Sequence, residues 1–306
     1  MNNTHKILLL TICVLCLTFM FSGGITTPDT DGLNYTEEVK YGTDPTQADT
    51  DNDGLHDGRE VEIGTNPTKK DTDNDGITDY EEIYKTDIYP DANPLQKDIY
   101  VEIDTTYSTF WLKELRVLQM NKVKQSFKNA PIKNPDGTTG INLHLQYDDE
   151  NKITYNNSTM SSQEYKSIQT NSFENKKYNY YHILITDSDI CYTSNCEITG
   201  MAFPWNNGAI VEAEYTYSAS AHTITHELGH LLGLLQYKNN CIDSKKCNVE
   251  EYPSVMNYKT NGEYYKFNTS DWKTINNSLH KEQKYDSCMK GEKILDNLLH
   301  NQKRCL

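Results

Sequence analysis

One short segment constrains the fold of this chain more than any other. Residues 226–236 read His-Glu-Leu-Gly-His-Leu-Leu-Gly-Leu-Leu-Gln. On a helix, the side chains of His226 and His230 leave the same face one turn apart, which suits two ligands of one metal ion. Glu227 follows the first histidine, where its carboxylate can reach a metal-bound water. Gly233 can end the helix and turn the chain, so that the segment's last residue swings back toward the metal.

The identity of the third metal ligand stays open at this level. A catalytic zinc site needs three protein ligands and an open position for water, and a third histidine is expected where the chain has Gln236. Our first prediction is that Gln236 binds through its amide oxygen. Alternatively, Asp243 or another acidic residue of 241–251 folds back and substitutes for it. His222 lies one turn before His226 but is expected to point away, and a fourth alternative is a site with no third ligand.

A second segment lies downstream of the histidines. Residues 254–258 read Ser-Val-Met-Asn-Tyr. With the His-Glu-x-x-His-x-x-Gly pattern upstream, Ser-x-Met-x-Tyr resembles the Met-turn of the metzincin clan of zinc proteases. The resemblance covers roughly residues 97–260 and implies an α+β fold, a metzincin-like zincin domain with a twisted mixed sheet, an active-site helix and a Met-turn. It also implies that the thioether of Met256 packs beneath the zinc ligands and that Tyr258 can approach the metal.

The same resemblance implies a secreted zinc-dependent endopeptidase that acts on a protein or peptide substrate. In that prediction His226, His230 and Gln236 bind zinc, and Glu227 is the general base for the attacking water. Tyr258 helps to hold the oxyanion, while Gly233 and Met256 have structural roles. An alternative of a different class is a catalytically inactive metzincin-like surface or adhesion protein that uses the scaffold and its calcium repeats for binding.

An acidic repeat precedes this region. Its second and third copies place carboxylates at positions 1, 3, 5, 9 and 12 of a loop with glycine at position 6, which is the pattern of a twelve-residue calcium loop. The first copy is eroded, with Thr27 at position 1. The predicted calcium-binding residues are Asp29, Asp31 and Glu38 in the first copy, Asp49, Asp51, Asp53, Leu55, Asp57 and Glu60 in the second, and Asp71, Asp73, Asp75, Ile77, Asp79 and Glu82 in the third.

Too few residues separate successive loops for the paired helices of an EF-hand. The run therefore resembles the calcium-binding thrombospondin type 3 repeat, in which ions rather than a hydrophobic core order the chain. Residues 27–88 hold few large apolar side chains, in agreement with that resemblance. We expect an irregular N-terminal module that serves as a spacer or stalk where calcium is plentiful.

The charge balance excludes some partners. Acidic residues outnumber basic ones by 44 to 29, for a net charge of −15. A chain this acidic is not expected to bind nucleic acid or an anionic membrane surface. Clustered carboxylates favour cations instead, so zinc and calcium are the expected cofactors.

The N-terminus predicts export. Lys6 is followed by an uncharged, mostly apolar run over 7–21 and then by small residues, the pattern of a signal peptide, with an uncleaved anchor as the alternative. No other segment is long and apolar enough to span a bilayer. Six of the eight cysteines lie beyond the signal and are expected to form disulfides in a secreted or cell-surface protein. The simplest pairing joins Cys191 to Cys196, Cys241 to Cys247 and Cys288 to Cys305.

Composition and periodicity divide the chain into three parts. These are a signal peptide over 1–24, calcium repeats over 25–95 and a metalloprotease domain over 96–306. Within the last part, strands are expected at 97–104, 140–145, 180–186 and 208–215, and helices at 109–128, 223–235, from 268 onward and at 292–300. The polar stretch 147–178 is expected to be a long excursion or insertion. The resemblance to zinc proteases implies that the strand at 208–215 can border the cleft and pair with an extended substrate.

Overall fold

The computed structural model describes residues 29–106, 115, 119–147, 153–192, 195–214, 216–235, 241–243, 247–260 and 265–279. The chain divides into two compact units, Met1–Lys70 and Asp71–Leu306. The sequence places the end of the repeats at residue 95, whereas the division of the structure falls immediately before Asp71. The third acidic loop is therefore part of the second unit.

Two short helices, α2 (Tyr35–Tyr41) and α3 (Asp57–Ile63), follow the acidic loops of the first unit. Both end at a glycine in the left-handed conformation, Gly42 and Gly64, with φ of 81° and 89°. Glycine adopts that conformation without the steric cost of a Cβ atom. The corresponding helix of the second unit is α4 (Asp79–Tyr84), which begins with a capping box between Thr78 and Glu81.

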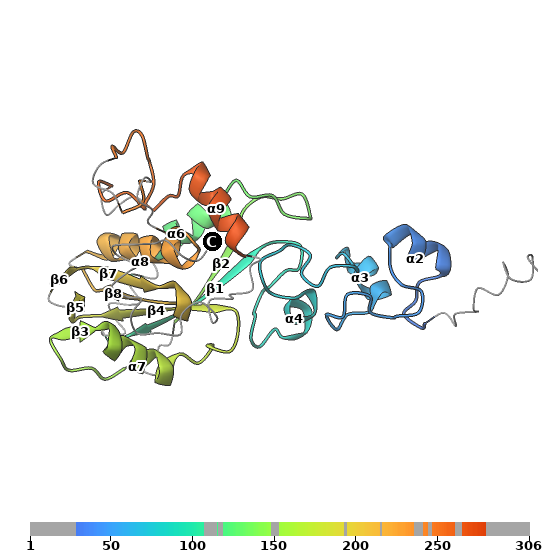
Figure 1. Ribbon diagram of the computed structural model, residues 1–306, viewed down its shortest axis with the longest axis horizontal. Helices are drawn as coiled ribbons and strands as arrows, with labels where there is room; N and C mark the ends of the chain where they lie inside the picture. Colours follow the sequence, from blue (N-terminus) through green and yellow to red (C-terminus); the bar gives the residue numbers. More distant parts are fainter. Residues whose placement is uncertain are drawn as a thin grey trace, which may run out of the picture. The chain divides into compact units, whose positions relative to one another are not determined.

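Five strands form the main sheet of the second unit. They are β1 (Asp98–Thr105), β2 (Asn142–Tyr147), β4 (Tyr180–Thr186), β7 (Gly200–Phe203) and β8 (Gly208–Glu212). Their order is β2-β1-β4-β8-β7, and each neighbouring pair is parallel except β7 and β8 (Figure 1). The architecture is mixed α/β with a mostly parallel sheet, which confirms the predicted mixed sheet.

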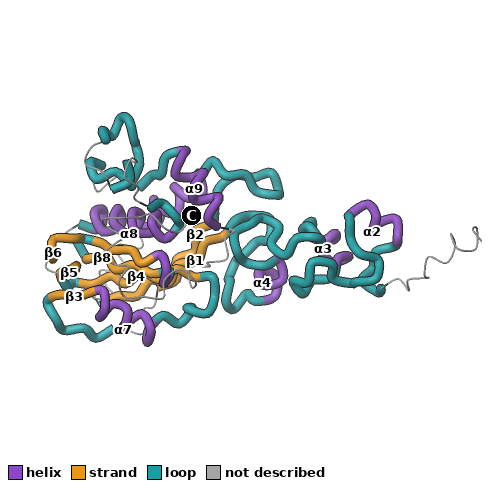
Figure 2. Tube along the Cα trace, viewed as in Figure 1, coloured by secondary structure: helices purple, strands orange, loops and turns teal. Residues whose placement is uncertain are grey.

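Helices cover both faces of this sheet. One face shares the largest apolar core with α6 (Asn121–Lys128), α8 (Tyr217–Leu231) and α9 (Thr269–Leu279). The other face packs against α7 (Ser162–Ser172) and a small sheet of β3 (Thr159–Ser161), β5 (Asp189–Tyr192) and β6 (Asn195–Ile198). Figure 2 shows α8 and α7 on opposite sides of the strands. Side chains of β4 alternate between the two cores, with Ile183 in the first and Leu184 in the second.

The stretch 147–178, expected as a long excursion or insertion, contains β3 and α7. One expectation from the sequence is wrong. The strand expected to border the cleft, at 208–215, lies inside the sheet between β4 and β7, since Gly200–Phe203 folds back along β8 through the 3-10 turn Pro204–Asn206. A capping box between Ser161 and Glu164 marks the start of α7 in the sequence.

The helix predicted at 223–235 begins earlier than expected. α8 starts at Tyr217, where the Thr216 hydroxyl caps the helix by accepting the backbone N–H of Ala219. The expected helix near 268 is α9, while the expected helix at 292–300 lies outside the described residues. Among the residues that the structure describes, no helix is long and apolar enough to cross a membrane.

The predicted disulfide between Cys241 and Cys247 is present. Cys191 is also disulfide-bonded, but the side chain of its predicted partner, Cys196, is not described. The predicted pair Cys288 and Cys305 lies outside the described residues, as does the predicted signal peptide over 1–24.

Candidate metal sites

α8 presents two histidines to one point. His226 and His230 lie one turn apart, and their ring centroids are 5.0 Å from each other. Each ring is held by a backbone carbonyl: Nδ1 of His226 donates to Val255 O at 2.9 Å, and Nδ1 of His230 donates to Leu234 O at 2.6 Å. Because Nδ1 donates to a carbonyl, Nε2 of each ring faces the shared space, where a metal ion can take the place of its proton.

Asp243 completes a three-residue cluster with these histidines. Its Oδ1 lies 2.8 Å from Nε2 of His226, and its Oδ2 lies 3.2 Å from Nε2 of His230. One ligand atom from each residue lies within 4.8 Å of the other two, a spacing at which the three can share a metal ion. Burial alone would lower the pKa of His230, but the hydrogen bond to Asp243 and its charge raise that pKa to about 9. Burial would raise the pKa of Asp243, yet the two imidazoles hold it well below its usual range.

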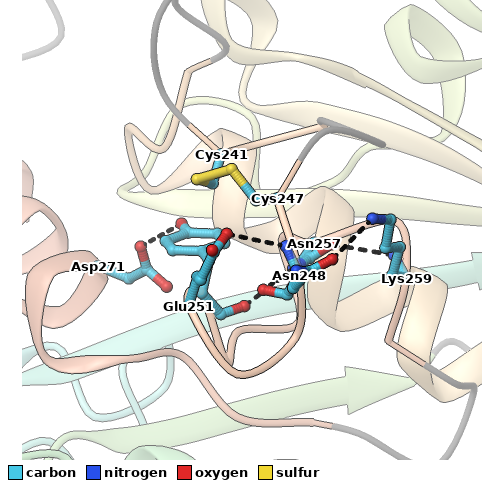
Figure 3. Close-up of a disulfide and its surroundings, with 8 residues drawn as sticks. Cys241, Cys247, Asn248, Glu251, Asn257, Lys259 and Asp271 are labelled. Carbon is cyan, nitrogen blue, oxygen red and sulfur yellow. Dashed lines mark hydrogen bonds between the residues drawn. A yellow bond between two sulfur atoms is a disulfide. The ribbon is translucent and has the colours of Figure 1, made fainter.

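The loop that carries Asp243 is tied down at two points. The disulfide between Cys241 and Cys247 brackets this residue in the sequence (Figure 3). The backbone N–H of Asp243 donates to Met256 O at 3.0 Å, with φ at +50°. A non-glycine residue in the left-handed region is held there by its surroundings.

The sequence suggests two other ligand candidates. Gln236 lies outside the described residues, so its proposed role stays a prediction. His222 lies on α8 with its ring centroid 6.5 Å from that of His226, and it does not belong to the described three-residue group.

Glu227 lies between α8 and β7. Its side chain is buried, and the backbone N–H of Ala202 donates to its carboxylate. A Cβ atom on Gly200 would lie 2.6 Å from Oε1 of Glu227, so only glycine leaves room for the carboxylate there. Burial raises the pKa of Glu227, although the nearby His230 and His226 oppose that shift. No pattern in the sequence singled out Gly200 or Ala202, because β7 was not expected.

The predicted Met-turn, residues 254–258, packs directly under α8. Val255 and Met256 are fully buried, and Ser254 Oγ donates to Asp271 Oδ2 at 2.5 Å. A Cβ atom on Gly229 would lie 2.5 Å from Sδ of Met256. The thioether therefore lies against the backbone of α8 between the two histidines. Asn257 and Asn248 extend the hydrogen bonding of this loop (Figure 3).

Tyr258 lies at the surface beside the cluster. It is 55% exposed, and its ring stacks on His226 with centroids 5.7 Å apart and planes 11° apart. Partial burial, then the charges of Asp243 and Glu227, raise the pKa of its hydroxyl. Its phenol is therefore a neutral hydrogen-bond donor at physiological pH.

Gly233 turns the chain after α8. The helix ends at Leu231, and Gly233 has φ of +93°. A Cβ atom at this position would also collide with Ser278 Oγ of α9. Both the backbone conformation and the close approach of α9 require glycine.

The acidic loops have converging carboxylates as well. In each of the three copies, ligand atoms from three acidic residues lie within 4.8 Å of one another. These groups are Asp29, Asp31 and Glu38, then Asp49, Asp51 and Asp53, and then Asp71, Asp73 and Asp75. Hard oxygen donors at this density suit Ca²⁺.

The predicted ligands at loop position 9 also accept hydrogen bonds within their own loops. Asp57 accepts the backbone N–H and the hydroxyl of Thr50, and Asp79 accepts the same two groups of Thr72. Each of these carboxylates closes its own loop. In the first copy, Glu38 accepts the hydroxyl of Thr43.

Comparison with known proteins bears on the two regions differently. Residues 29–48, 49–70 and 71–85 match the family model of the bacterial TSP3 repeat. No curated protein matches the chain.

Several solved structures have a limited likeness to the chain. Archaemetzincin from Methanopyrus kandleri is 11% identical over 61% of this chain and 97% of its own, with a TM-score of 0.37. Metalloproteinase-II from Bacteroides fragilis is 15% identical over 63% of this chain and 56% of its own, with a TM-score of 0.42. A zinc-dependent peptidase from Methanocorpusculum labreanum is 13% identical over 58% of this chain and 99% of its own, with a TM-score of 0.37. TM-scores below 0.5 do not establish a shared fold, so these likenesses support no further statement about this chain.

Proposed function

We propose that this chain is a secreted zinc-dependent endopeptidase with a metzincin-like domain over 96–306. The observation that carries the proposal is the convergence of His226, His230 and Asp243, with each imidazole oriented by a backbone carbonyl. Two imidazoles that can bind through Nε2 and one carboxylate are a donor set that suits catalytic zinc. We therefore propose Asp243, rather than Gln236, as the third ligand.

The residues around the cluster have separate proposed roles in peptide hydrolysis. A zinc ion held there supplies Lewis-acid activation of a water and of a carbonyl group. Glu227 accepts the proton of the water and later passes a proton to the leaving amine. Its raised pKa suits that exchange, because the carboxylate binds a proton more readily than an exposed one. Tyr258, stacked on His226, is placed to donate a hydrogen bond to the developing oxyanion.

β7 is the proposed docking edge for the substrate. It is one of the two edge strands of the described main sheet, and its Ala202 N–H donates to Glu227. A peptide that adds to this edge as an extended strand passes next to the general base. This replaces the strand at 208–215 as the expected substrate-binding element.

Secretion and calcium binding are part of the same proposal. The apolar run over 7–21 predicts export, and the bond between Cys241 and Cys247 persists in an oxidising compartment. Calcium is proposed as the ligand of the acidic loops within 25–95, because their carboxylates converge in three groups.

The ligand set is tested by zinc affinity. Asp243→Ala removes one proposed donor and is expected to weaken zinc binding by more than about 100-fold, since even residues that only orient ligands contribute 10- to 100-fold. Competition against a chromophoric chelator measures the change, with Gln236→Ala as the matched control. If Gln236→Ala weakens zinc binding and Asp243→Ala does not, the third ligand is Gln236 and our assignment is wrong.

The general base is tested by peptide hydrolysis. Glu227→Gln keeps the shape of the side chain and removes its basicity, so the rate of hydrolysis is expected to fall about 10²- to 10⁴-fold. Zinc content should stay unchanged, because Glu227 is not a proposed ligand. If the zinc-loaded wild type hydrolyses a casein substrate no faster than this variant, the proposal of an endopeptidase fails.

A further inference from the structure

The third acidic loop is packed into the unit that carries the zinc cluster. The structure divides immediately before Asp71, so the whole loop from Asp71 to Glu82 belongs to the second unit. Its neighbours are the start of β1, the start of β4 and the end of α9. A loop that only linked one repeat to the next would not need these contacts.

Three polar contacts join the loop to these elements. The backbone N–H of Asp98, the first residue of β1, donates to Asp75 Oδ2 at 2.6 Å. Nζ of Lys97 donates to Asn74 O at 3.1 Å. Nδ2 of Asn179, just before β4, donates to Asp75 O at 3.4 Å. One of the loop's proposed ligands thus also positions the first residue of a central strand.

Apolar contacts also join the third acidic loop to the rest of the second unit. Ile77, at position 7 of the loop, is 1% exposed and belongs to a core cluster with four aromatic residues of the second unit. Those residues are Tyr89, Tyr100, Phe173 and Tyr180. The third loop therefore supplies part of the hydrophobic core of the second unit.

Two carboxylates of the loop are buried without partners. Asp73 and Glu82 are each 2% exposed, and both carboxylate oxygens of each are buried without a hydrogen-bond partner. Unpaired buried charges of one sign are strongly unfavourable, and a divalent ion with oxygen ligands removes the penalty.

We propose that Asp71, Asp73, Asp75 and Glu82, enclosed by β1 and β4, form a composite calcium site that is structurally part of the second unit. Calcium bound there is a folding cofactor of that unit, because the loop that binds it shares hydrogen bonds and a core cluster with β1 and β4. The level of free calcium therefore controls whether the unit that carries the zinc cluster is assembled. The inference rests on the proposed calcium loops and not on peptidase activity.

A continuous set of contacts leads from this site to the Met-turn. A Cβ atom on Gly76 would lie 2.9 Å from Leu279 O, so the loop touches the last residue of α9. Near the start of the same helix, Asp271 accepts hydrogen bonds from Ser254 and Tyr252, each at 2.5 Å. Loss of the ion is expected to destabilise α9 and, with it, the support of the zinc cluster.

Matched variants of the full chain test the proposal. Asp73→Asn and Asp51→Asn change the same loop position in the third and second copies. All tryptophans, Trp111, Trp205 and Trp272, lie beyond Lys70, so tryptophan fluorescence reports unfolding of the second unit alone. Thermal unfolding is followed while CaCl₂ is titrated at fixed buffered zinc.

In the wild type, rising calcium is expected to raise the unfolding temperature of the tryptophan transition. Asp73→Asn should shift the calcium midpoint of that rise at least about tenfold upward, whereas Asp51→Asn should leave it unchanged. If Asp73→Asn fails to fold at any calcium concentration while Asp51→Asn folds normally, the proposal is also supported. The proposal is overturned if the unfolding temperature of the wild type does not change with calcium. It is also overturned if the calcium midpoint shifts equally in the two variants. Peptide hydrolysis is not a readout, so an inactive zinc cluster would leave this result intact.

Discussion

The second and third acidic loops are nearly identical in local geometry. In both, Asp at position 1 accepts the backbone N–H of the residue three positions later, and Asn52 and Asn74 share a left-handed φ of 61° and 62°. In both, the carboxylate at position 5 accepts the N–H of the residue at position 7, at 2.7 Å in one loop and 2.8 Å in the other. The local hydrogen bonds follow from the sequence pattern, because they join residues only a few positions apart.

The surroundings of the two loops differ. Asp51 and Asp53 are half-buried, whereas Asp73 and Asp75 are 2% exposed. Burial, then repulsion from Asp53, raises the pKa of Asp51 to about 6, and the same causes act much more strongly on Asp73. One motif can thus be half-buried in one place and contribute to a unit's core in another.

The largest difference between the loops is expected from their buried apolar residues. Ile77→Ala creates a cavity in the aromatic cluster of the second unit and should lower its free energy of unfolding by ~2–4 kcal/mol. Leu55→Ala, at the same loop position, should change the tryptophan-monitored transition by less than ~0.5 kcal/mol. Chemical denaturation in saturating calcium measures both. Equal effects would mean that the third loop is no more a part of the second unit than the second loop is.

A smaller difference is expected at position 6. Gly32 and Gly76 occupy this position in the first and third copies with φ of +105° and +97°, so alanine is strained at both. Only at Gly76 does the new Cβ atom meet other groups, 2.9 Å from Asn179 Nδ2 and from Leu279 O.

Gly76→Ala should therefore lower the unfolding free energy of the second unit by ~2–3 kcal/mol, the sum of about 1 kcal/mol of backbone strain and the displacement of a backbone carbonyl. Gly32→Ala should leave the tryptophan transition in place. The comparison fails if Gly76→Ala is as mild as Gly32→Ala in the same denaturation experiment.

The smallest effect is expected from surface charges, where the two regions should behave alike. Arg59 and Glu62 form an exposed ion pair on α3, and Lys85 pairs with Glu81 at the end of α4. Replacing either cation with methionine should cost less than ~0.5 kcal/mol, because solvent screens such pairs. Circular dichroism at saturating calcium checks both variants. A larger loss of unfolding free energy for Lys85→Met than for Arg59→Met would show that surface charge, and not burial alone, makes the two loops differ in their contribution to stability.

Much of the candidate site was predictable from local pattern. His226, Glu227 and His230 follow from one spacing, and β1 and β4 follow from apolar stretches at the expected positions. β7 was missed because four residues with two small side chains carry little periodic signal. α7 could have been predicted from the capping box of Ser161 and Glu164.

The sequence by itself determined the elements whose causes are local. These are the ion-binding loops with their left-handed glycines, the helix that places two histidines on one face, and the tight turn at Gly233. Only the tertiary structure decided which distant carboxylate meets the histidines and which acidic loop is buried. Asp243 reaches the imidazoles because its loop bonds to the Met-turn, and Asp73 is buried because β1 and β4 enclose its loop. Such long-range contacts depend on packing, which short-range spacing in a sequence does not encode.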